Sequence, residues 1–448
     1  MKKIKYLTAL TLSKLAVKLI KLRGKSKGTS APGMLAMKIS PDFITQASKY
    51  NNEKIITVTG TNGKTTTTGL IAHIMKQNNK KVVHNTEGAN MLTGIATALV
   101  NNVSLNTKSD YLIFETDEAY LTKLYNYVDV DCLLITNLFR DQLDRYGEAD
   151  TTYKKIKEAI SKNKNLKVFI NADDPSLENI ADDNEKIYFG LESVEYAYST
   201  NELKPPADNN DCHFCGKSLI YNKVFYAHVG HFSCECGYCR KTPDYRGFVK
   251  VFETYSDLKI LHSDKEYNFK INMPGLYNVY NALGAISMAL ELGVSEEIIN
   301  QSLQTYSAIF GRAEITTING KKALVQLIKN PVGASEVIRQ TKGFSNSQIV
   351  IILNDEYADG RDISWIWDTD FDTLKDTNKN IILSGSRAYD AAIRLKYAGI
   401  NQNLLTIEKD VKLAIEKACE NTLANETMLI FPTYTALLKM QNIFPKKK

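Results

Sequence analysis

The chain has 448 residues, of which 44% are hydrophobic and 24% are charged, and its formal net charge is +6. This length suits roughly two or three domains, and the composition is that of an ordinary globular protein. The mild positive charge gives little support to nucleic-acid binding. No apolar run approaches ~20 residues, so we expect no transmembrane helix. Lysines recur through the apolar N-terminal stretch and no small-residue cleavage site follows it, so we expect a cytoplasmic protein without a signal peptide.

Residues 4–22 place apolar side chains at helical spacing with lysines between them, which predicts a basic amphipathic helix. Such a helix either packs on the protein's own body or makes peripheral contact with a membrane, and we favour packing. Residues 24–33 predict a loop, and a further helix is expected after Pro41. We treat residues 1–50 as an N-terminal helical extension.

Residues 55–66 contain a β-branched run, a turn with two glycines and a Lys-Thr-Thr sequence that opens a helix. This order predicts a phosphate-binding loop, because backbone N–H groups and the positive helix end face the anion. A lysine then reaches the outer phosphates, and the hydroxyl after it is placed to bind Mg²⁺. The predicted nucleotide-binding residues are Gly60, Thr61, Asn62, Gly63, Lys64, Thr65 and Thr66.

Strands and helices alternate after this motif, with strands expected at 55–59, 81–84, 110–115, 131–136 and 166–170 and a helix at 64–77. The alternation predicts a parallel sheet covered on both faces, with ligands beyond the carboxyl ends of its strands. Glu115 ends one strand, and we predict that it holds Mg²⁺ opposite Thr65. Asp117 and Glu118 are interpreted as ordinary acids at a helix N-terminus.

Two further polar segments follow expected strands. Residues 136–147 contain a Thr-Asn-x3-Asp-x2-Asp-x2-Gly pattern, which we interpret as the rim of a site. Residues 171–174 read Asn-Ala-Asp-Asp before a proline, which is typical of a capped turn.

These motifs together resemble the Mur ligases and folylpolyglutamate synthases. Residues 275–282 (Gly-Leu-Tyr-Asn-Val-Tyr-Asn-Ala) and 311–314 (Gly-Arg-Ala-Glu) strengthen the resemblance. It implies an enzyme that uses ATP and Mg²⁺ to activate a carboxylate as an acyl phosphate, which an amine then attacks. It also implies that Asn278 and Asn281 contact the adenine and that Arg312 reaches the nucleotide phosphates.

Two features of the sequence differ from the family's pattern or match it only loosely. Gln142 stands where many members have a histidine ligand for a second metal, so a second Mg²⁺ is left open. Tyr153 and Lys157 reproduce the spacing of the family's carbamoylated lysine, but an exposed helix lysine is an equal alternative.

Five of the seven cysteines fall between residues 212 and 239, which in a cytoplasmic chain favours metal binding over disulfides. Eighteen residues separate two cysteine knuckles, a spacing that predicts a zinc ribbon inserted at about 205–245. Four thiolates around the ion leave no position for substrate, so the site is expected to be structural. The predicted zinc ligands are Cys212, Cys215, Cys234 and Cys236, with Cys239 as the substitute and His213, His228 and His231 as alternatives.

A second α/β domain is predicted from about residue 315, with strands at 323–327, 348–353, 380–384 and 404–407 and helices at 333–342, 387–398 and 410–421. Residues 354–362 follow an apolar strand with several acids, and Trp365 and Trp367 come next. Acids beside aromatic residues at the end of a strand are typical of a binding rim.

The C-terminal pattern, the cysteine insertion and the ending Pro-Thr-Tyr-Thr at 432–435 resemble the MurT family, the Mur-ligase-like subunits of lipid II isoglutaminyl synthase. The resemblance implies amidation of the α-carboxylate of D-glutamate in the lipid II stem peptide to D-isoglutamine. It also implies a class I glutamine amidotransferase partner of the GatD type that supplies ammonia. Asp355 matches the aspartate thought to complete that partner's Cys-His pair, so we assign it a catalytic role beside Lys64 and Glu115.

The expected fold is a Mur-ligase-type central P-loop domain with a parallel sheet and an inserted zinc ribbon (51–312), followed by a Rossmann-like α/β domain (313–448). Two other functions remain open from the residues. One is an amino-acid-adding ligase of the Mur or folylpolyglutamate type. The other is a non-catalytic nucleotide-binding scaffold.

Overall fold

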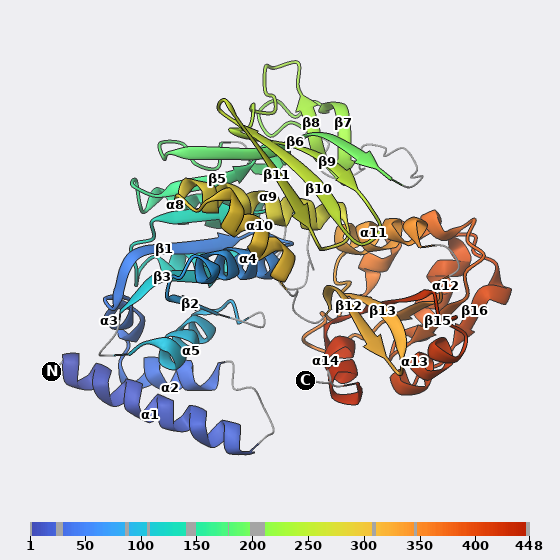
Figure 1. Ribbon diagram of the computed structural model, residues 1–448, viewed down its shortest axis with the longest axis horizontal. Coiled ribbons are helices and arrows are strands. Elements are labelled where there is room, and N and C mark those ends of the chain that lie inside the picture. Colours follow the sequence, from blue (N-terminus) through green and yellow to red (C-terminus); the bar gives the residue numbers. More distant parts are fainter. Residues whose placement is uncertain are drawn as a thin grey trace.

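The computed structural model describes residues 2–23, 30–85, 89–104, 108–139, 149–177, 179–197, 211–306, 311–344 and 347–444. Two α/β parts, each built on its own sheet, lie side by side (Figure 1). Among the described helices, none combines the length and apolar character that a membrane span requires.

The larger sheet has nine strands: β1 (Asn51–Thr59), β2 (Val82–His84), β3 (Ser109–Glu115), β4 (Cys132–Ile135), β5 (Lys167–Asn171), β6 (Lys186–Tyr196), β9 (Tyr245–Val251), β10 (Ser256–His262) and β11 (Lys265–Ile271). Their order is β11-β10-β9-β6-β5-β4-β1-β3-β2. β1 lies in the middle of the six parallel strands from β6 to β2, where it pairs with β3 and β4. Of the nine strands, β10 alone runs against the others: it is antiparallel to β9 and β11 near one edge, whereas β9 is parallel to β6. The phosphate-loop motif therefore follows a central strand.

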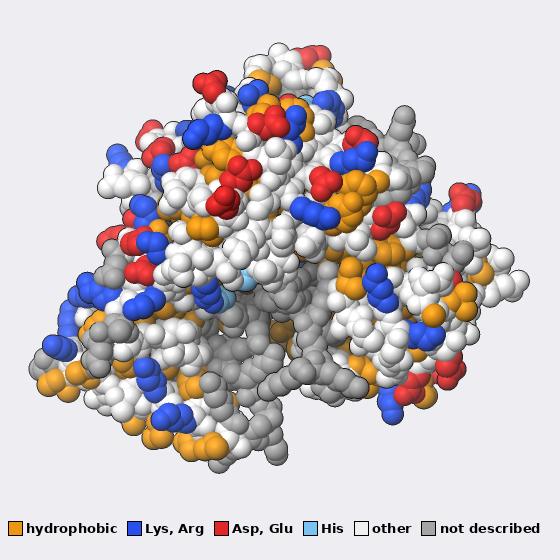
Figure 2. All heavy atoms as spheres, in the orientation of Figure 1, with side chains coloured by type: hydrophobic (Ala, Val, Ile, Leu, Met, Phe, Trp, Pro, Cys, Tyr) orange, Lys and Arg blue, Asp and Glu red, His pale blue; other side chains and the backbone are white. Residues whose placement is uncertain are grey.

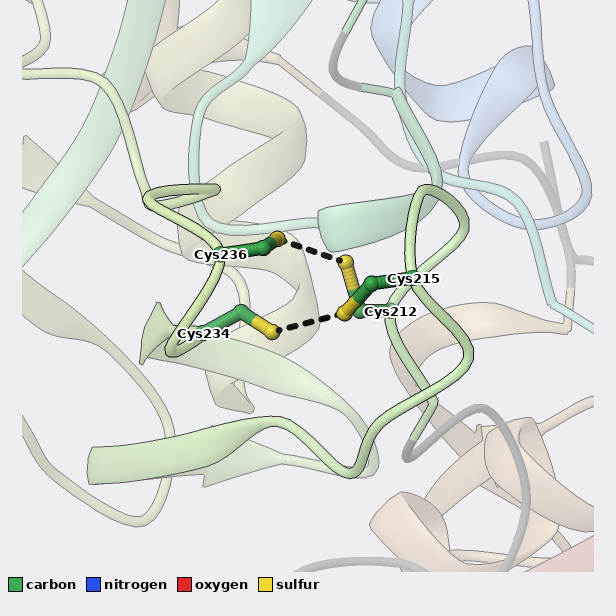
Figure 3. Close-up of side chains that lie close together, drawn as sticks. All are labelled: Cys212, Cys215, Cys234 and Cys236. Carbon is green, nitrogen blue, oxygen red and sulfur yellow. Dashed lines mark hydrogen bonds between the residues drawn. The ribbon is translucent and has the colours of Figure 1, made fainter.

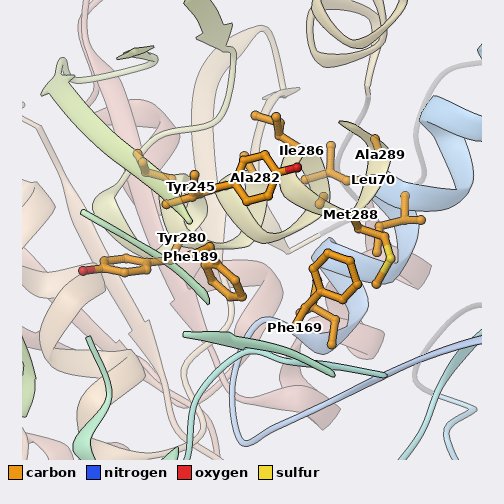
Figure 4. Packing of buried hydrophobic residues seen from close by; sticks show 14 of the residues in the cluster. Leu70, Phe169, Phe189, Tyr245, Tyr280, Ala282, Ile286, Met288 and Ala289 are labelled. Carbon is orange, nitrogen blue, oxygen red and sulfur yellow. The ribbon is translucent and has the colours of Figure 1, made fainter. Parts of the chain in front are cut away.

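Helices cover both faces of this sheet because side chains of the central strands alternate between two cores. Ile56 and Val58 of β1 face one core, and Ile55 faces the other. The first face carries α4 (Lys64–Gln77), α9 (Leu276–Glu291) and α10 (Glu296–Thr305). Figure 4 shows how aromatic side chains of the sheet pack against α4 and α9. The second face carries α1 (Lys2–Arg23), α2 (Ala31–Ile39), α3 (Phe43–Ser48), α5 (Leu92–Asn102), α6 (Glu118–Leu124) and α8 (Ala149–Ser161).

The smaller sheet has six strands: β12 (Arg312–Ile318), β13 (Lys321–Gln326), β14 (Ile349–Ile352), β15 (Ile381–Ser384), β16 (Leu405–Ile407) and β17 (Thr427–Pro432). Their order is β12-β13-β17-β14-β15-β16, and only β12 is antiparallel. One face packs against α11 (Pro331–Gln340) and α12 (Ala388–Tyr397). The other face packs against α13 (Val411–Glu420) and α14 (Tyr434–Ile443).

The predicted α/β fold is confirmed, but several of its elements were not predicted, among them α5, α9, α10, β6, β9, β10, β11 and β12. α2 begins at Ala31, inside the segment expected to be a loop. β17 and α14 were not predicted, although β17 lies between β13 and β14 in the sheet. The cysteine segment adds a separate hairpin of β7 (Ile220–Tyr226) and β8 (Val229–Ser233).

Candidate nucleotide site and cysteine cluster

The loop between β1 and α4 adopts a shape that requires glycine at two positions. Gly60 and Gly63 have φ angles of +123° and +86°, in a region that side chains disfavour. A Cβ atom on Gly60 would lie 2.3 Å from Thr136 Oγ1, and one on Gly63 would lie 2.0 Å from Asn281 Oδ1. The two glycines therefore let the loop approach the segment after β4 and helix α9 closely.

Thr136 and Asn137, directly after β4, hold the middle of this loop. The Asn62 N–H donates to Asn137 Oδ1 at 2.9 Å, and Asn137 Nδ2 donates to the Asn62 carbonyl at 3.1 Å. The Thr136 hydroxyl donates to the same carbonyl at 2.6 Å. Part of the predicted rim therefore holds the phosphate loop in place by hydrogen bonds. The later members of this rim, including Gln142, lie outside the described residues.

The Lys64 side chain is only 11% exposed and forms an ion pair that the sequence interpretation missed. Its Nζ lies 2.8 Å from Glu118 Oε1 and also donates to the Gly60 carbonyl. The Gly60 N–H donates to the same Glu118 oxygen at 3.2 Å. Glu118 lies in the first turn of α6, as expected for a helix N-terminal acid, but it also contacts the phosphate loop, which the sequence did not indicate. Asp117 does cap α6, since its side chain accepts from the Ala119 N–H.

The acids around Lys64 set its charge. Burial works to lower the pKa of Lys64, but the carboxylates of Glu118, Asp117 and Glu115 outweigh it and raise that pKa above its usual value. Burial raises the pKa of Glu118, and the ammonium of Lys64 opposes this shift. Lys64 is thus a permanent cation within reach of three acidic side chains.

Glu115 and Thr65 both lie at the carboxyl end of the central strands. Glu115 is 3% exposed, and Asn90 Nδ2 donates to its carboxylate at 3.4 Å. Its backbone N–H donates to Asn85 Oδ1 at 2.8 Å, which fixes the end of β3. Thr65 is in the first turn of α4 and is also buried. A carboxylate and a hydroxyl are hard oxygen donors of the kind that Mg²⁺ prefers.

A cavity of about 710 Å³, counting space open to solvent, adjoins the loop. Its walls come from both α/β parts, so a ligand here would contact the two together. Asn278 and Asn281 of α9 line it, as does Tyr226 from the inserted hairpin. Its lining from the C-terminal part includes Gly311, Ala313, Leu327, Lys329, Val332, Gly333, Glu336 and Val337.

The two predicted adenine-binding residues are fixed by short contacts within α9. Asn278 Nδ2 donates to the Pro274 carbonyl at 2.8 Å, and Asn281 Nδ2 donates to Asn278 Oδ1 at 3.3 Å. Arg312 opens β12 beside the cavity, but its side chain lies outside the described part of the structure.

Residues 329 and 330 of the C-terminal part meet the phosphate loop directly. Asn330 Nδ2 donates to Asn62 Oδ1 at 3.0 Å, and Lys329 Nζ donates to the Thr61 carbonyl at 3.3 Å. Asn330 is fully buried and also caps α11 through the Gly333 N–H. No sequence motif pointed to these two residues, because their proximity depends on how the two sheets are placed.

The four predicted zinc ligands lie together (Figure 3). Cys212 Sγ is 3.6 Å from Cys236 Sγ, and Cys215 Sγ is 3.5 Å from Cys234 Sγ. All four sulfur atoms lie within 4.8 Å of one another. Cys239 is exposed and is not a member of this cluster. His228 and His231 bond instead to the Asp174 carboxylate and the Leu191 carbonyl.

Asp173 and Asp174 anchor the cysteine insertion to the main sheet, beyond the capped turn that was expected. The fully buried Asp173 carboxylate accepts from Arg240 Nε at 2.6 Å and from the Tyr280 hydroxyl at 2.7 Å. Asp174 lies 3.1 Å from His228 Nε2. Its other oxygen accepts from the Leu138 N–H at 2.7 Å, directly after the residues Thr136 and Asn137 that hold the phosphate loop.

Aromatic contacts continue this connection into the cavity. The ring of Tyr226 meets Tyr280 of α9 edge-on at 5.4 Å between centroids, and it lies 5.7 Å from Phe139. Phe139 also packs on His228 at 4.7 Å. One end of the insertion therefore holds the cysteines, and the other forms a wall of the cavity.

Asp355 follows β14 and is held by two neighbours from the segment before α12. Its carboxylate accepts from the Ser386 hydroxyl at 2.9 Å and from Arg387 Nε at 2.8 Å. Burial opposes ionisation, but these two partners lower the pKa of Asp355 below its usual value. Its side chain is 19% exposed, so an ionised carboxylate is held in a fixed orientation with partial access to solvent.

Lys157 lies in α8 and pairs with Asp182 Oδ2 at 2.9 Å. The hydrogen bond that Lys157 Nζ donates to this carboxylate raises the pKa of Lys157, which favours the ammonium over the neutral amine that carbamoylation needs. Of the two interpretations that the spacing allowed, this contact favours the exposed helix lysine.

Comparisons with known proteins agree with this arrangement. Residues 58–289 match the Mur ligase middle domain, and residues 327–437 match the MurT ligase C-terminal domain. The fold is similar to that of a pseudomurein peptide ligase type C from Methanothermus fervidus, with a TM-score of 0.71 and 23% identity over 90% of this chain and 80% of that one. It is also similar to MurF ligase from Thermotoga maritima in complex with ADP, with a TM-score of 0.65 and 12% identity over 90% of this chain and 83% of that one.

Two relatives match over nearly their whole length. The MurT subunit of lipid II isoglutaminyl synthase (glutamine-hydrolyzing) from Staphylococcus aureus strain COL is 35% identical over 97% of this chain and 96% of its own. The subunit of the same name from Streptococcus pneumoniae strain R6 is 36% identical over 94% of this chain and 93% of its own. This chain therefore belongs to the MurT family, a group of ligases built on the Mur ligase middle domain.

Proposed function

We propose that this chain is the ATP-dependent synthetase subunit of a lipid II isoglutaminyl synthase. It would activate the α-carboxylate of D-glutamate in the lipid II stem peptide as an acyl phosphate and amidate it to D-isoglutamine. Full-length similarity to subunits of that name carries the proposal. The largely buried Lys64 beside a cavity shared by both α/β parts supports it.

In this proposal the phosphate loop and Lys64 bind the phosphates of ATP, and Asn278, Asn281 and Arg312 fix the rest of the nucleotide. Thr65 and Glu115 would hold Mg²⁺, which neutralises phosphate charge when bound. Glu118 keeps Lys64 charged and directed at the loop. Lys329 and Asn330 bring the C-terminal part against the same loop.

The reaction needs positioning and charge neutralisation more than covalent help from the protein. A carboxylate oxygen attacks the γ-phosphorus and ADP leaves, which gives the acyl phosphate. Ammonia then attacks the carbonyl carbon, the C–O bond to phosphate breaks, and a proton leaves the nitrogen. Lys64 is placed to stabilise the negative charge of the transferred group.

The cysteine cluster fits zinc. Four thiolates at about 2.3 Å from the ion define a tetrahedron with edges of about 3.8 Å. The two sulfur separations of 3.5 and 3.6 Å are close to that edge. Cys212, Cys215, Cys234 and Cys236 would fill all four positions, so the ion would stabilise the insertion and take no part in the chemistry.

The ammonia would come from a glutaminase subunit of the GatD type. Outside the cluster, burial raises the pKa of Cys132 to about 11 and also raises the pKa of Cys419, so neither is a ready nucleophile. Asp355 would orient the histidine of the partner's Cys-His pair and stabilise its charged form. We place the reaction in the cytoplasm at the inner face of the membrane, where lipid II is anchored.

The nitrogen source tests this proposal. Purified chain is incubated with lipid II, ATP and either ammonium or glutamine, and amidated lipid II is measured by mass spectrometry. We expect ammonium alone to support amidation and glutamine to support it only when the glutaminase subunit is added. Strong glutamine-dependent amidation by this chain alone would contradict the proposal.

A further inference from the structure

Helix α1 is apolar on two faces, and only one of them packs on the protein. Tyr6, Ala9, Leu10 and Ser13 are buried at the inner face. The Tyr6 ring lies 5.4 Å from the ring of Phe43 in α3. The expected packing on the protein's own body is therefore present, but it leaves several large apolar side chains of the helix exposed.

The outer face exposes a continuous row of large aliphatic side chains. Leu12, Leu15, Leu19 and Leu22 are 45%, 52%, 54% and 83% exposed. Their spacing of three or four residues places them along one side of the helix. Ile4 is 69% exposed and lies about two turns further toward the N-terminus. Single exposed leucines are ordinary, but a row on one helix marks an interaction surface.

The charges of α1 indicate what that surface meets. The helix contains six lysines and one arginine and has no acidic residue. Lys2, Lys3, Lys5 and Lys18 are exposed around the row. In Figure 2 hydrophobic and basic side chains gather along the edge of the molecule where Figure 1 places α1. A second copy of α1 would bring cations against cations, whereas an anionic lipid surface complements both the charge and the apolar row.

We propose that the outer face of α1 binds an anionic membrane surface, with the helix lying in the plane of the lipid headgroups. The row Leu12, Leu15, Leu19 and Leu22 enters the acyl boundary, and the flanking lysines contact lipid phosphates. The helix does not span the bilayer, since its inner face is already used for packing. The inference rests on the proposed function in one respect: a lipid-linked substrate gives the enzyme a reason to dock.

The docked helix would also hold the nucleotide-binding part in place. α1 packs on α2 and α5, and α2 is locked to α5 where the Gly33 N–H donates to Thr97 Oγ1 at 2.9 Å. A Cβ atom on Gly33 would lie 2.0 Å from the Thr93 carbonyl oxygen, so the two helices touch at their backbones. Lys14 Nζ adds a bond to the Val103 carbonyl at 2.8 Å. Through α2 and α5, the proposed membrane contact is therefore joined to the sheet whose strand β1 leads into the phosphate loop.

Binding to vesicles tests the proposal without any turnover. The full chain is sedimented with vesicles of phosphatidylglycerol mixed with phosphatidylcholine, and with vesicles of phosphatidylcholine alone. We expect binding to the anionic vesicles that weakens as salt is raised. The variant Leu15→Ser/Leu19→Ser should bind roughly tenfold more weakly or worse, because two apolar side chains no longer enter the lipid.

The matched control is Leu413→Ser/Leu423→Ser, which removes two similarly exposed leucines from the C-terminal part. It should bind vesicles like the unmodified chain, and thermal unfolding should show that both variants fold. Equal vesicle binding by Leu15→Ser/Leu19→Ser would overturn the proposal. So would a failure of the unmodified chain to bind anionic vesicles, or a dimer in solution that this variant abolishes. Amidation of a lipid-free acceptor by Leu15→Ser/Leu19→Ser should persist, which separates docking from the proposed chemistry.

Discussion

The Lys64–Glu118 pair shows how single residues prepare the phosphate site. Replacing Lys64 with Ala should abolish ATP-dependent amidation, because no other side chain of the loop carries a positive charge to the phosphates. Glu118→Gln keeps the shape but removes the charge that holds the pKa of Lys64 high. We expect it to lower the rate of amidation on the order of a hundredfold. Steady-state kinetics of ammonium-dependent amidation measures both.

Both variants should still form the complex with a glutaminase subunit, measured by size-exclusion chromatography. Full activity of Lys64→Ala would favour a non-catalytic scaffold. Wild-type activity of Glu118→Gln would show that the ion pair serves only the loop's structure.

Asp355 and Arg387 form the second residue-scale test. Asp355→Asn should reduce glutamine-dependent amidation on the order of a hundredfold or more, because an amide cannot stabilise a charged histidine as a carboxylate does. Ammonium-dependent amidation should be unchanged, since no transfer of ammonia from the partner is needed. Equal loss of both activities would remove Asp355 from the proposed role.

Arg387→Ala should also lower glutamine-dependent amidation, by a smaller factor than Asp355→Asn, and leave ammonium-dependent amidation unchanged. It should in addition change how the glutamine-dependent activity depends on pH. The folded-state pKa of Asp355 lies below its ordinary value of 3.8, so the carboxylate stays ionised until the pH falls below that value. Without Arg387 that pKa rises, so the ratio of glutamine- to ammonium-dependent activity should decline at a higher pH than in the unmodified chain. If the activity ratio declines at the same pH in the variant and the unmodified chain, the orienting role of Arg387 is contradicted.

Sequence patterns predicted the residues whose function is local and missed those whose function depends on distant contacts. Gly60, Gly63 and Lys64 follow a fixed order in one short loop, so their spacing alone indicates a phosphate site. Glu118 looks like any acid at a helix start, and only the turn between β3 and α6 brings it to Lys64. Asn330 lies far from Asn62 in the chain, and nothing in its neighbourhood indicates their contact.

At the scale of elements, the insertion links the cysteine cluster to the cavity beside the phosphate loop. Cys215→Ser/Cys236→Ser should lose bound zinc and loosen the hairpin that carries Tyr226. We expect nucleotide binding to weaken roughly tenfold, equivalent to about 1.4 kcal/mol. Zinc content is measured by atomic absorption and nucleotide affinity by fluorescence titration.

Cys239→Ser is the matched control, because this cysteine belongs to the same insertion but lies outside the cluster. It should keep both zinc and nucleotide affinity. Loss of zinc without any change in nucleotide affinity would show that the hairpin stands independently of the metal. Loss of zinc in Cys239→Ser would show that Cys239 is a zinc ligand in place of one of the four clustered cysteines.

Element prediction succeeded where periodicity and flanking residues agreed, as for β1 and α4. It failed for β17, whose short apolar run carries no alternation and lies between strands from other parts of the chain. A fully buried strand cannot be distinguished from a short core segment by its pattern. The helix after it, α14, was missed together with it.

At the scale of the whole molecule, the cavity beside the phosphate loop is lined by residues of both α/β parts. Asn330→Ala removes the bond to Asn62 and the cap of α11. It should cost about 1 kcal/mol of unfolding free energy from the lost cap. It should also lower ATP affinity, because Lys329 and the loop are no longer aligned. Thermal unfolding and nucleotide titration measure the two effects.

Asp410→Ala is the control for the cap. Asp410 caps α13 through the Lys412 and Leu413 N–H groups and has no contact with the phosphate loop. It should lose a similar amount of stability and keep its ATP affinity. Equal ATP affinity in both variants would contradict the proposed alignment between the two parts.

The most direct test of the central claim is to find where nitrogen is added. Lipid II is incubated with ATP, isotopically labelled ammonium and the purified chain, and the stem peptide is then sequenced by tandem mass spectrometry. The account predicts one labelled nitrogen, as the α-carboxamide of the D-glutamate residue, with ADP and phosphate formed in equal amounts. A product enlarged by a whole amino acid, or an unmodified stem peptide despite ATP hydrolysis, would contradict it.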